Sequence, residues 1–274
     1  MTLFSKQHRP YKTTIFFLFT LSGLMIFSCK SKNSGDHIKD GDKNNYPNYF
    51  IAHAGGTIDG IKYTNSLEAL DLSYSKGCKL FELDLVLTTD GKIIAQHDPP
   101  GITEEEFMAQ PIAGKYTPMN MDSINCWFQN HPDAILVTDK INDPQKIYDE
   151  FLFRDRVIME LFSWDAIDKA NELGIKPMVS ENLIFGTSEI EQILDDKKIE
   201  YICMSRYYHI SGNEDLLRRL KKKGIKNYVF HLELPLPIPE PSAEQYVWDY
   251  EMDFCYGMYA NDLGLLDSLL NEQR

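Results

Sequence analysis

The feature that most restricts the fold is a regular alternation of short apolar runs with helical segments. Eight runs have the length and composition of buried strands: 49–54, 80–87, 134–139, 156–161, 176–180, 201–205, 227–232 and 254–259. Each is followed by a helical pattern or by an insertion that contains one. This alternation favours a parallel sheet, and eight such units predict an α/β protein with a (β/α)8 TIM barrel over residues 48–274. An open, doubly wound sheet is the alternative, although no Gly-x-Gly-x-x-Gly motif follows the first run.

An insertion is expected after the second strand. Thr89-Asp90-Gly91 has the composition of a hairpin turn and leads into a further strand at 92–97. Irregular sequence then extends over 102–132, with helices expected at 104–110 and 122–130. Its aromatic and methionine side chains form either the core of the segment itself or a cover over a bound substrate.

The chain is acidic, with 28 Lys and Arg against 41 Asp and Glu and a net charge of -13. Affinity for nucleic acid depends on basic side chains that neutralise phosphates, and the sequence has no basic stripe. Nucleic acid is therefore excluded as a partner. A phosphorylated small molecule would need a metal ion or a few local cations to be held.

The N-terminus has the pattern of a secretory signal. Basic residues precede the apolar stretch 15–27, which is shorter than the roughly 20 residues that span a bilayer. Its end, Ser28-Cys29, resembles the bacterial lipobox. We therefore predict a lipoprotein signal peptide at 1–28, lipidation of Cys29, and a flexible tether at 29–47. The mature protein would be extracytoplasmic and lipid-anchored to a bacterial membrane; an uncleaved anchor helix is the alternative.

Two acidic residues interrupt the second strand. Glu82 and Asp84 are two positions apart, so their side chains share one face of the strand. Strands of a parallel barrel are covered on both faces, and unpaired buried carboxylates are costly. A hard divalent cation with oxygen ligands, Ca²⁺ or Mg²⁺, explains the pair. The alternative is an ion pair between one acid and a lysine on a neighbouring strand.

Two histidines stand at the ends of strands. His53 ends the first strand, and His97 ends the hairpin strand. Barrel enzymes carry their chemistry at the C-terminal ends of the strands. Because imidazole titrates near neutrality, two histidines beside the acidic pair can act as a general base and a general acid.

The order and spacing of several motifs resemble the glycerophosphodiester phosphodiesterase family, barrel enzymes related to phosphatidylinositol phospholipase C. The motifs are Ile51-Ala52-His53-Ala54-Gly55, Thr64-Asn65-Ser66, Phe81-Glu82-Leu83-Asp84, Thr88-Thr89-Asp90-Gly91 and His97-Asp98. The resemblance implies a membrane-anchored phosphoric diester hydrolase that cleaves a small-molecule glycerophosphodiester with the help of a divalent cation.

The resemblance also assigns roles. His53 and His97 would be the acid-base pair, with His53 weakly favoured as the base, and Glu82 and Asp84 would be metal ligands. The family has a third acidic ligand on the next strand, for which Asp139 is the candidate here. Asn65 falls in the family's Glu-Asn-Thr motif and is a candidate substrate contact.

The sequence departs from the family where phosphate is bound. Ala54 stands in place of an arginine that helps to hold the phosphate. Lys140 is a candidate phosphate contact, but it is displaced by one residue from the family's lysine, and strand alternation would turn it to the opposite face. Arg206, directly after the sixth strand, is the candidate substitute cation; a surface salt bridge is its other interpretation.

Other functions remain open at this point. A barrel without the arginine could bind a phosphorylated ligand as a non-catalytic lipoprotein. A metal-independent enzyme similar to phosphatidylinositol phospholipase C would use two histidines without the acidic cluster. Glycoside hydrolysis by paired acids is disfavoured, because Glu82 and Asp84 lie on one strand and do not face each other across a sugar.

Overall fold

The computed structural model describes residues 40–185, 187–209, 211–233 and 242–272. The expected signal peptide, Cys29 and most of the expected tether lie outside these ranges and stay predictions. The last part of the tether overlaps a described 3-10 helix, η1 (Asp40–Tyr49). Within the described ranges, no helix combines the length and the apolar character that crossing a bilayer requires.

Eight parallel strands close into a barrel, which confirms the predicted fold. They are β1 (Phe50–Ala52), β2 (Leu80–Leu87), β4 (Ile135–Asp139), β5 (Val157–Leu161), β6 (Lys176–Ser180), β7 (Tyr201–Ser205), β8 (Lys226–Phe230) and β9 (Gly257–Ala260). The order around the barrel is β1-β9-β8-β7-β6-β5-β4-β2, and the pairing of Ile51 with Leu80 closes it. The open, doubly wound alternative is therefore wrong.

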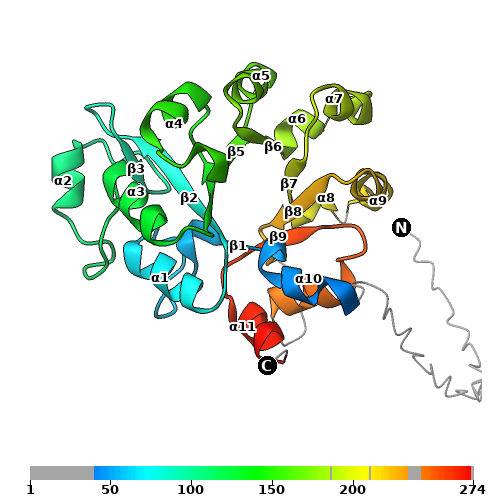
Figure 1. Cartoon of the computed structure of the whole chain (residues 1–274), viewed down its shortest axis with the longest axis horizontal. Coiled ribbons are helices and arrows are strands. Elements are labelled where there is room, and N and C mark those ends of the chain that lie inside the picture. The colour runs from blue at the N-terminus through cyan, green and yellow to red at the C-terminus, as the bar shows by residue number, and fades with distance from the viewer. Residues whose placement is uncertain (1–39, 186, 210, 234–241, 273–274) are drawn as a thin grey trace, which may run out of the picture. The chain divides into compact units, whose positions relative to one another are not determined.

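Helices surround the barrel (Figure 1). They are α1 (Leu67–Ser75), α3 (Met121–Asn130), α4 (Pro144–Glu150), α5 (Trp164–Leu173), α7 (Ile190–Asp196), α9 (Glu214–Lys222), α10 (Ala243–Tyr250) and α11 (Gly264–Asn271). One of them follows each strand of the barrel, directly or after an insertion, as the sequence predicts. Two short helices, α6 (Glu181–Ile184) and α8 (Arg206–His209), were not predicted, because four residues carry no periodicity.

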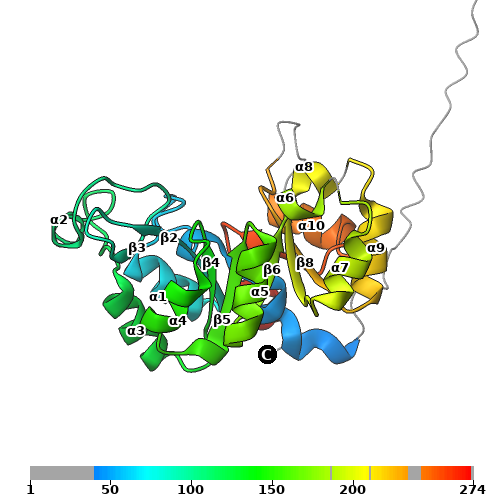
Figure 2. The ribbon, with the colours of Figure 1, turned by 90° about the horizontal axis from the view of Figure 1, so that it is seen from above.

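Strand alternation divides the interior of the barrel into an apolar and a polar part. An inner apolar cluster is made of Ile51, Leu80, Val137, Ile158, Met178, Tyr201, Cys203, Tyr228 and Tyr259. Two residues further along β2, the inward side chains are acidic. The helices α6 and α8, which directly follow their strands, lie at the upper rim in Figure 2, and η1 lies at the lower side. The polar part of the interior therefore opens at the C-terminal ends of the strands.

The insertion after β2 has the predicted hairpin and helices. β3 (Ile93–Ala95) pairs antiparallel with β2, and α2 (Glu104–Met108) and α3 follow. Phe107 packs with Val86 and Ile94 in a small core of its own, and Met119 and Met121 join the main core. Most of the apolar side chains of the insertion thus serve its packing.

Gly257 allows β9 to pass close to two neighbours. A Cβ atom at this position would lie 2.6 Å from the Tyr49 carbonyl oxygen and 2.7 Å from Cε1 of Tyr228. Overpacking of this kind costs about 1–3 kcal/mol. We expect Gly257→Ala to lower the free energy of unfolding by that amount in denaturant titrations. Gly264→Ala is the control, since its nearest contact is 3.4 Å, and an unchanged Gly257→Ala protein would contradict this account.

Candidate active site

Three carboxylates from two neighbouring strands converge in the mouth of the barrel. β2 and β4 pair in parallel, with Asp84 directly opposite Asp139, and Glu82 stands two residues before Asp84 on the same face. One carboxylate oxygen from each residue lies within 4.8 Å of the others. The structure therefore brings together the three residues that the sequence nominates as metal ligands.

Backbone and amide donors fix two of these carboxylates. The Ala54 backbone N–H donates to Oε2 of Glu82 at 2.6 Å. The Asn65 amide donates to Oδ2 of Asp84 at 2.9 Å and accepts from the Asp84 backbone N–H at 3.0 Å. Asn65 is almost fully buried and does not line the cavity. Asn65 therefore positions Asp84, and its direct contact with a substrate stays a prediction.

The buried position of the acids makes their ionisation costly. Burial, reinforced by Asp84 and Asp139, raises the pKa of Glu82 well above its ordinary value. Burial also raises the pKa of Asp84, against the opposing effect of the hydrogen bond from Asn65. Within the described residues, Oε1 of Glu82 is buried and has no hydrogen-bond partner. Such an oxygen among converging carboxylates fits a bound cation.

Lys140 reaches this cluster in spite of its displaced position in the sequence. Its Nζ lies 3.3 Å from Oδ2 of Asp139 and 3.9 Å from Oδ1 of Asp84. β4 ends at Asp139, and Lys140 has a positive φ of 68°, so the alternation that would turn it outward stops one residue earlier. One lysine leaves two of three negative charges uncompensated, and a divalent cation would balance them. An ion pair with Lys140 alone therefore does not balance the negative charge of the three ionised carboxylates.

His53 lies beside the acidic cluster at the end of β1. Burial is the main reason that its pKa falls to about 4, and the positive charges of His231, Lys140 and His97 lower it further. The hydrogen bond with the side chain of Asn261 opposes this shift. The imidazole of His53 is therefore neutral at physiological pH and able to accept a proton.

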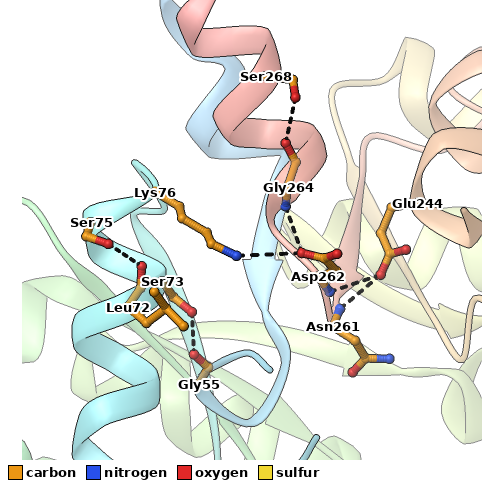
Figure 3. Close-up of polar contacts among 10 residues, drawn as sticks. All are labelled: Gly55, Leu72, Ser73, Ser75, Lys76, Glu244, Asn261, Asp262, Gly264 and Ser268. Atoms are coloured by element: carbon orange, nitrogen blue, oxygen red, sulfur yellow. Dashed lines mark hydrogen bonds and ion pairs between the residues drawn. The ribbon is translucent and has the colours of Figure 1, made fainter. Parts of the chain in front are cut away.

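The turns on either side of His53 are fixed by buried contacts. Ser73 donates to the Gly55 carbonyl at 2.6 Å, directly after His53. Glu244 on α10 accepts from the backbone N–H groups of Asn261 and Asp262, both at 3.2 Å (Figure 3). The backbone turns that follow β1 and β9 are thus each fixed by hydrogen bonds from a helix.

His97 occupies the opposite, more open side of the cavity. Its Nδ1 lies 3.1 Å from Oδ1 of Asp98, and 55% of its side chain is exposed. His97 lines the main cavity and also a second cavity of about 560 Å³ beneath the insertion, which includes Phe107 and Ile112. Tyr63 lines both cavities as well.

The main cavity has a volume of about 640 Å³. The candidates His53, His97, Glu82, Asp84, Asp139 and Lys140 line it together with Tyr63, Glu160, Phe162, Ser180, Glu181, Asn182, Phe230, His231 and Tyr259. The sequence analysis missed Glu160 and His231. Burial, followed by the charge of Asp139, raises the pKa of Glu160 to about 7. An acid inside the apolar run of β5 and a histidine directly after β8 were the signals that could have identified them.

Arg206 does not line the cavity. Its guanidinium is buried, with Nη2 at 2.6 Å from Oε1 of Glu251 and Nη1 donating to the Leu232 carbonyl at 2.8 Å. Nε also donates to the Glu251 carboxylate, at 2.9 Å. The prediction that Arg206 holds phosphate is wrong, because its donors are already engaged inside the fold. The residue forms a salt bridge, but a buried one.

The fold and the cavity define a (β/α)8 barrel protein whose mouth brings together two histidines and three carboxylates that could hold a metal ion. Residues 41–110 match the model of the Glycerophosphoryl diester phosphodiesterase family. The comparison with curated proteins gives no match. The matched range contains His53, Glu82, Asp84 and His97 but ends before Asp139.

Solved structures of glycerophosphodiester phosphodiesterases share the fold. One from Parabacteroides distasonis has a TM-score of 0.64 at 16% identity, over 84% of this chain and 92% of its own. One from Thermotoga maritima has a TM-score of 0.59 at 19% identity, over 81% and 97%. An Oleispira antarctica phosphodiesterase, in complex with the product sn-glycerol-3-phosphate, has a TM-score of 0.62 at 14% identity, over 84% and 99%. At these identities, the likeness shows the barrel fold that this chain shares with them.

The raised carboxyl pKa values predict how stability depends on pH without metal. A folded-state pKa above the ordinary 4.5 of glutamate means that the native state holds protons that the unfolded state has released. Between pH 6.5 and 8, we expect the thermal midpoint of the metal-free protein to fall, as Glu160, with its pKa of about 7, is forced to ionise. His53 is neutral in the folded state but half protonated in the unfolded state at pH 6.5, so it opposes this fall near pH 6.5 and contributes little above pH 7.5.

Calorimetry at pH 6.5 and 8, with and without Ca²⁺ or Mg²⁺, measures this effect. The cation should raise the midpoint more at pH 8, where the carboxylates are ionised. Glu160→Gln should reduce the pH dependence of the metal-free protein. A metal-free midpoint that rises steadily from pH 6.5 to 8 would contradict the proposed cost of ionisation.

Proposed function

We propose that the protein hydrolyses a glycerophosphodiester in a metal-dependent reaction with two histidines as acid and base. The observation that carries the proposal is the buried, partly unpartnered cluster of Glu82, Asp84 and Asp139 with His53 and His97 in the same cavity. The family match over 41–110 supports the same reaction class.

The cation would be held by Glu82, Asp84 and Asp139. Ligands that are all carboxylates suit hard cations, which favours Ca²⁺ or Mg²⁺. A bound cation of this kind neutralises phosphate charge and stabilises the charge that develops on its oxygens. Lys140, whose pKa is raised because attraction by Asp139 and Asp84 outweighs its burial, stays positive beside the same oxygens.

The two histidines have environments suited to different roles. His53 is neutral and anchored by Asn261, so it accepts a proton from the nucleophile, which is water or a neighbouring hydroxyl of the substrate. His97 is more exposed and lies against Asp98. It donates a proton to the leaving alkoxide as the phosphorus–oxygen bond breaks. The alcohol group would then extend toward the second cavity, which His97 also lines.

The lipid anchor is a separate proposal. The pattern of residues 1–28 and Cys29 supports secretion and lipidation, and therefore an extracytoplasmic enzyme attached to a bacterial membrane. Metabolic labelling with a radioactive fatty acid should mark the wild-type protein and leave Cys29→Ser unlabelled. Labelling of the Cys29→Ser protein would refute lipidation at this thiol.

Measuring substrate turnover, with and without a chelator, distinguishes the proposed function from two others. A non-catalytic binding lipoprotein would retain ligand affinity without cleavage, yet the structure keeps both histidines and the complete acidic cluster in one cavity. A metal-independent enzyme would be indifferent to chelators, and the unpartnered oxygen of Glu82 argues against it.

Removal of the metal is the first test of the proposed function. Dialysis against a chelator should abolish hydrolysis of glycerophosphocholine or bis(p-nitrophenyl) phosphate, and Ca²⁺ or Mg²⁺ should restore it. Glu82→Gln should lower kcat/KM at least about a hundredfold, since stabilisation of the developing charge is lost. Glu105→Gln, an exposed carboxylate on α2, is the matched control. Full activity of Glu82→Gln, or of the chelated enzyme, would exclude the metal-dependent reaction.

The acid-base roles make a second prediction. His53→Ala and His97→Ala should each reduce kcat about 10²–10⁴-fold. Because the lowered pKa keeps His53 neutral down to about pH 4, the acidic limb of the kcat/KM profile should lie well below the 6.5 of an ordinary histidine. A limb centred near 6.5, or a full rate in either alanine variant, would refute these assignments.

A further inference from the structure

His231 is a third histidine of the cavity, and the acid-base mechanism does not use it. It follows β8 directly, lines the same cavity as His53 and packs edge-on against Phe230, with ring centroids 4.8 Å apart. It is close enough that its charge is the largest electrostatic contribution to the lowered pKa of His53. The ring therefore faces the same volume in which the substrate's phosphate would react.

The backbone that carries His231 is held in an unusual conformation. His231 has a φ of 49°, which is uncommon for a residue other than glycine and persists only where the surroundings enforce it. The buried Arg206 donates to the carbonyl of the next residue, Leu232, at 2.8 Å. Glu233 forms an ion pair with Lys62 on the other side. The turn is thus fixed by two contacts from separate parts of the chain.

Other basic groups of the cavity are committed to carboxylates or to proton transfer. Lys140 lies against Asp139 and Asp84, and Nδ1 of His97 lies against Asp98. Within the described part of the chain, no hydrogen-bond or ion-pair partner contacts the ring nitrogens of His231. The ring of His231 is therefore free to bind a ligand, whereas the proposed mechanism uses the remaining nitrogens of His53 and His97 for proton transfer.

We propose that His231 donates a hydrogen bond to a non-bridging phosphate oxygen of the substrate and that Arg206, by fixing Leu232, positions it. The inference rests on the proposed function, because it assigns a phosphate contact within the same site. In this proposal, the buried Arg206–Glu251 pair fixes the turn that carries His231 and does not itself contact the substrate.

Replacement of His231 by residues with and without a donor tests the contact. In the metal-loaded enzyme, His231→Phe keeps a ring against Phe230 but removes the donor. We expect kcat/KM for bis(p-nitrophenyl) phosphate to fall, and the inhibition constant of inorganic phosphate to rise, roughly ten- to a hundredfold each, the range of a hydrogen bond to a charged group. His231→Arg, which restores a donor, should keep the inhibition constant within a few-fold of the wild-type value.

His131→Phe is the matched control, since this histidine stacks on Trp127 and does not line the cavity. Its phosphate inhibition constant should equal that of the wild type. A His231→Phe enzyme with wild-type values, or a His231→Arg enzyme as weak as His231→Phe, would overturn the proposal.

The experiments distinguish a failure of the proposed hydrolysis from a failure of the proposed His231 contact. If the wild-type enzyme cleaved no phosphodiester, the proposed function would fail, while calorimetric binding of inorganic phosphate to the metal-loaded wild-type and His231→Phe proteins would still decide the role of His231. Equal affinities would overturn the contact, and a weaker His231→Phe complex would support it. Hydrolysis by the wild type with an unaffected His231→Phe variant would retain the function and remove only this inference.

Discussion

Mutual repulsion among buried carboxylates is the constraint on which the site depends. Glu82, Asp84 and Asp139 lie within 4.8 Å of one another in the mouth of a barrel whose interior below them is apolar. Glu160 on the next strand adds a fourth acid, and burial raises its pKa to about 7. One lysine does not compensate this charge, so the folded state is electrostatically incomplete without a cation. The same repulsion that costs stability gives the cluster its affinity for metal.

The surrounding backbone has a conformation that most residues avoid. Ala54, Asn65, Lys140 and His231 all have positive φ; three of them closely follow a strand of the barrel, and Asn65 stands just before α1. A hydrogen bond enforces each turn. Ala54 donates to Glu82, Asn65 bonds Asp84, the Lys140 N–H donates to Asp139, and Arg206 holds the carbonyl after His231. In three of these four turns, a carboxylate of the acidic cluster provides the restraint.

The barrel could be predicted from the sequence because its signal is repeated eight times, and each repeat is local. The acidic cluster could be predicted for a similar reason, because the two acids of β2 interrupt an otherwise apolar strand. Lys140 and Arg206 were misjudged because their positions depend on where a strand ends and on a partner 45 residues away, Glu251. Glu160 carried the same signal as Glu82 but stood alone on its strand. A single acid in a buried strand is weaker evidence for a metal site than a pair of acids on one face.

The arrangement of charges around the barrel explains how so acidic a chain could accept a phosphodiester. The acids are on β2, β4 and β5, which are neighbours, whereas His53 and His231 follow β1 and β8 on the adjoining arc. The acids and these two histidines thus occupy different arcs of the mouth. In the proposed reaction, one side of the phosphate would meet the cation on β2 and β4, and the other would meet His231. His53 follows the strand between these sides, so a nucleophile activated there would approach a phosphorus atom whose non-bridging oxygens are held from both directions.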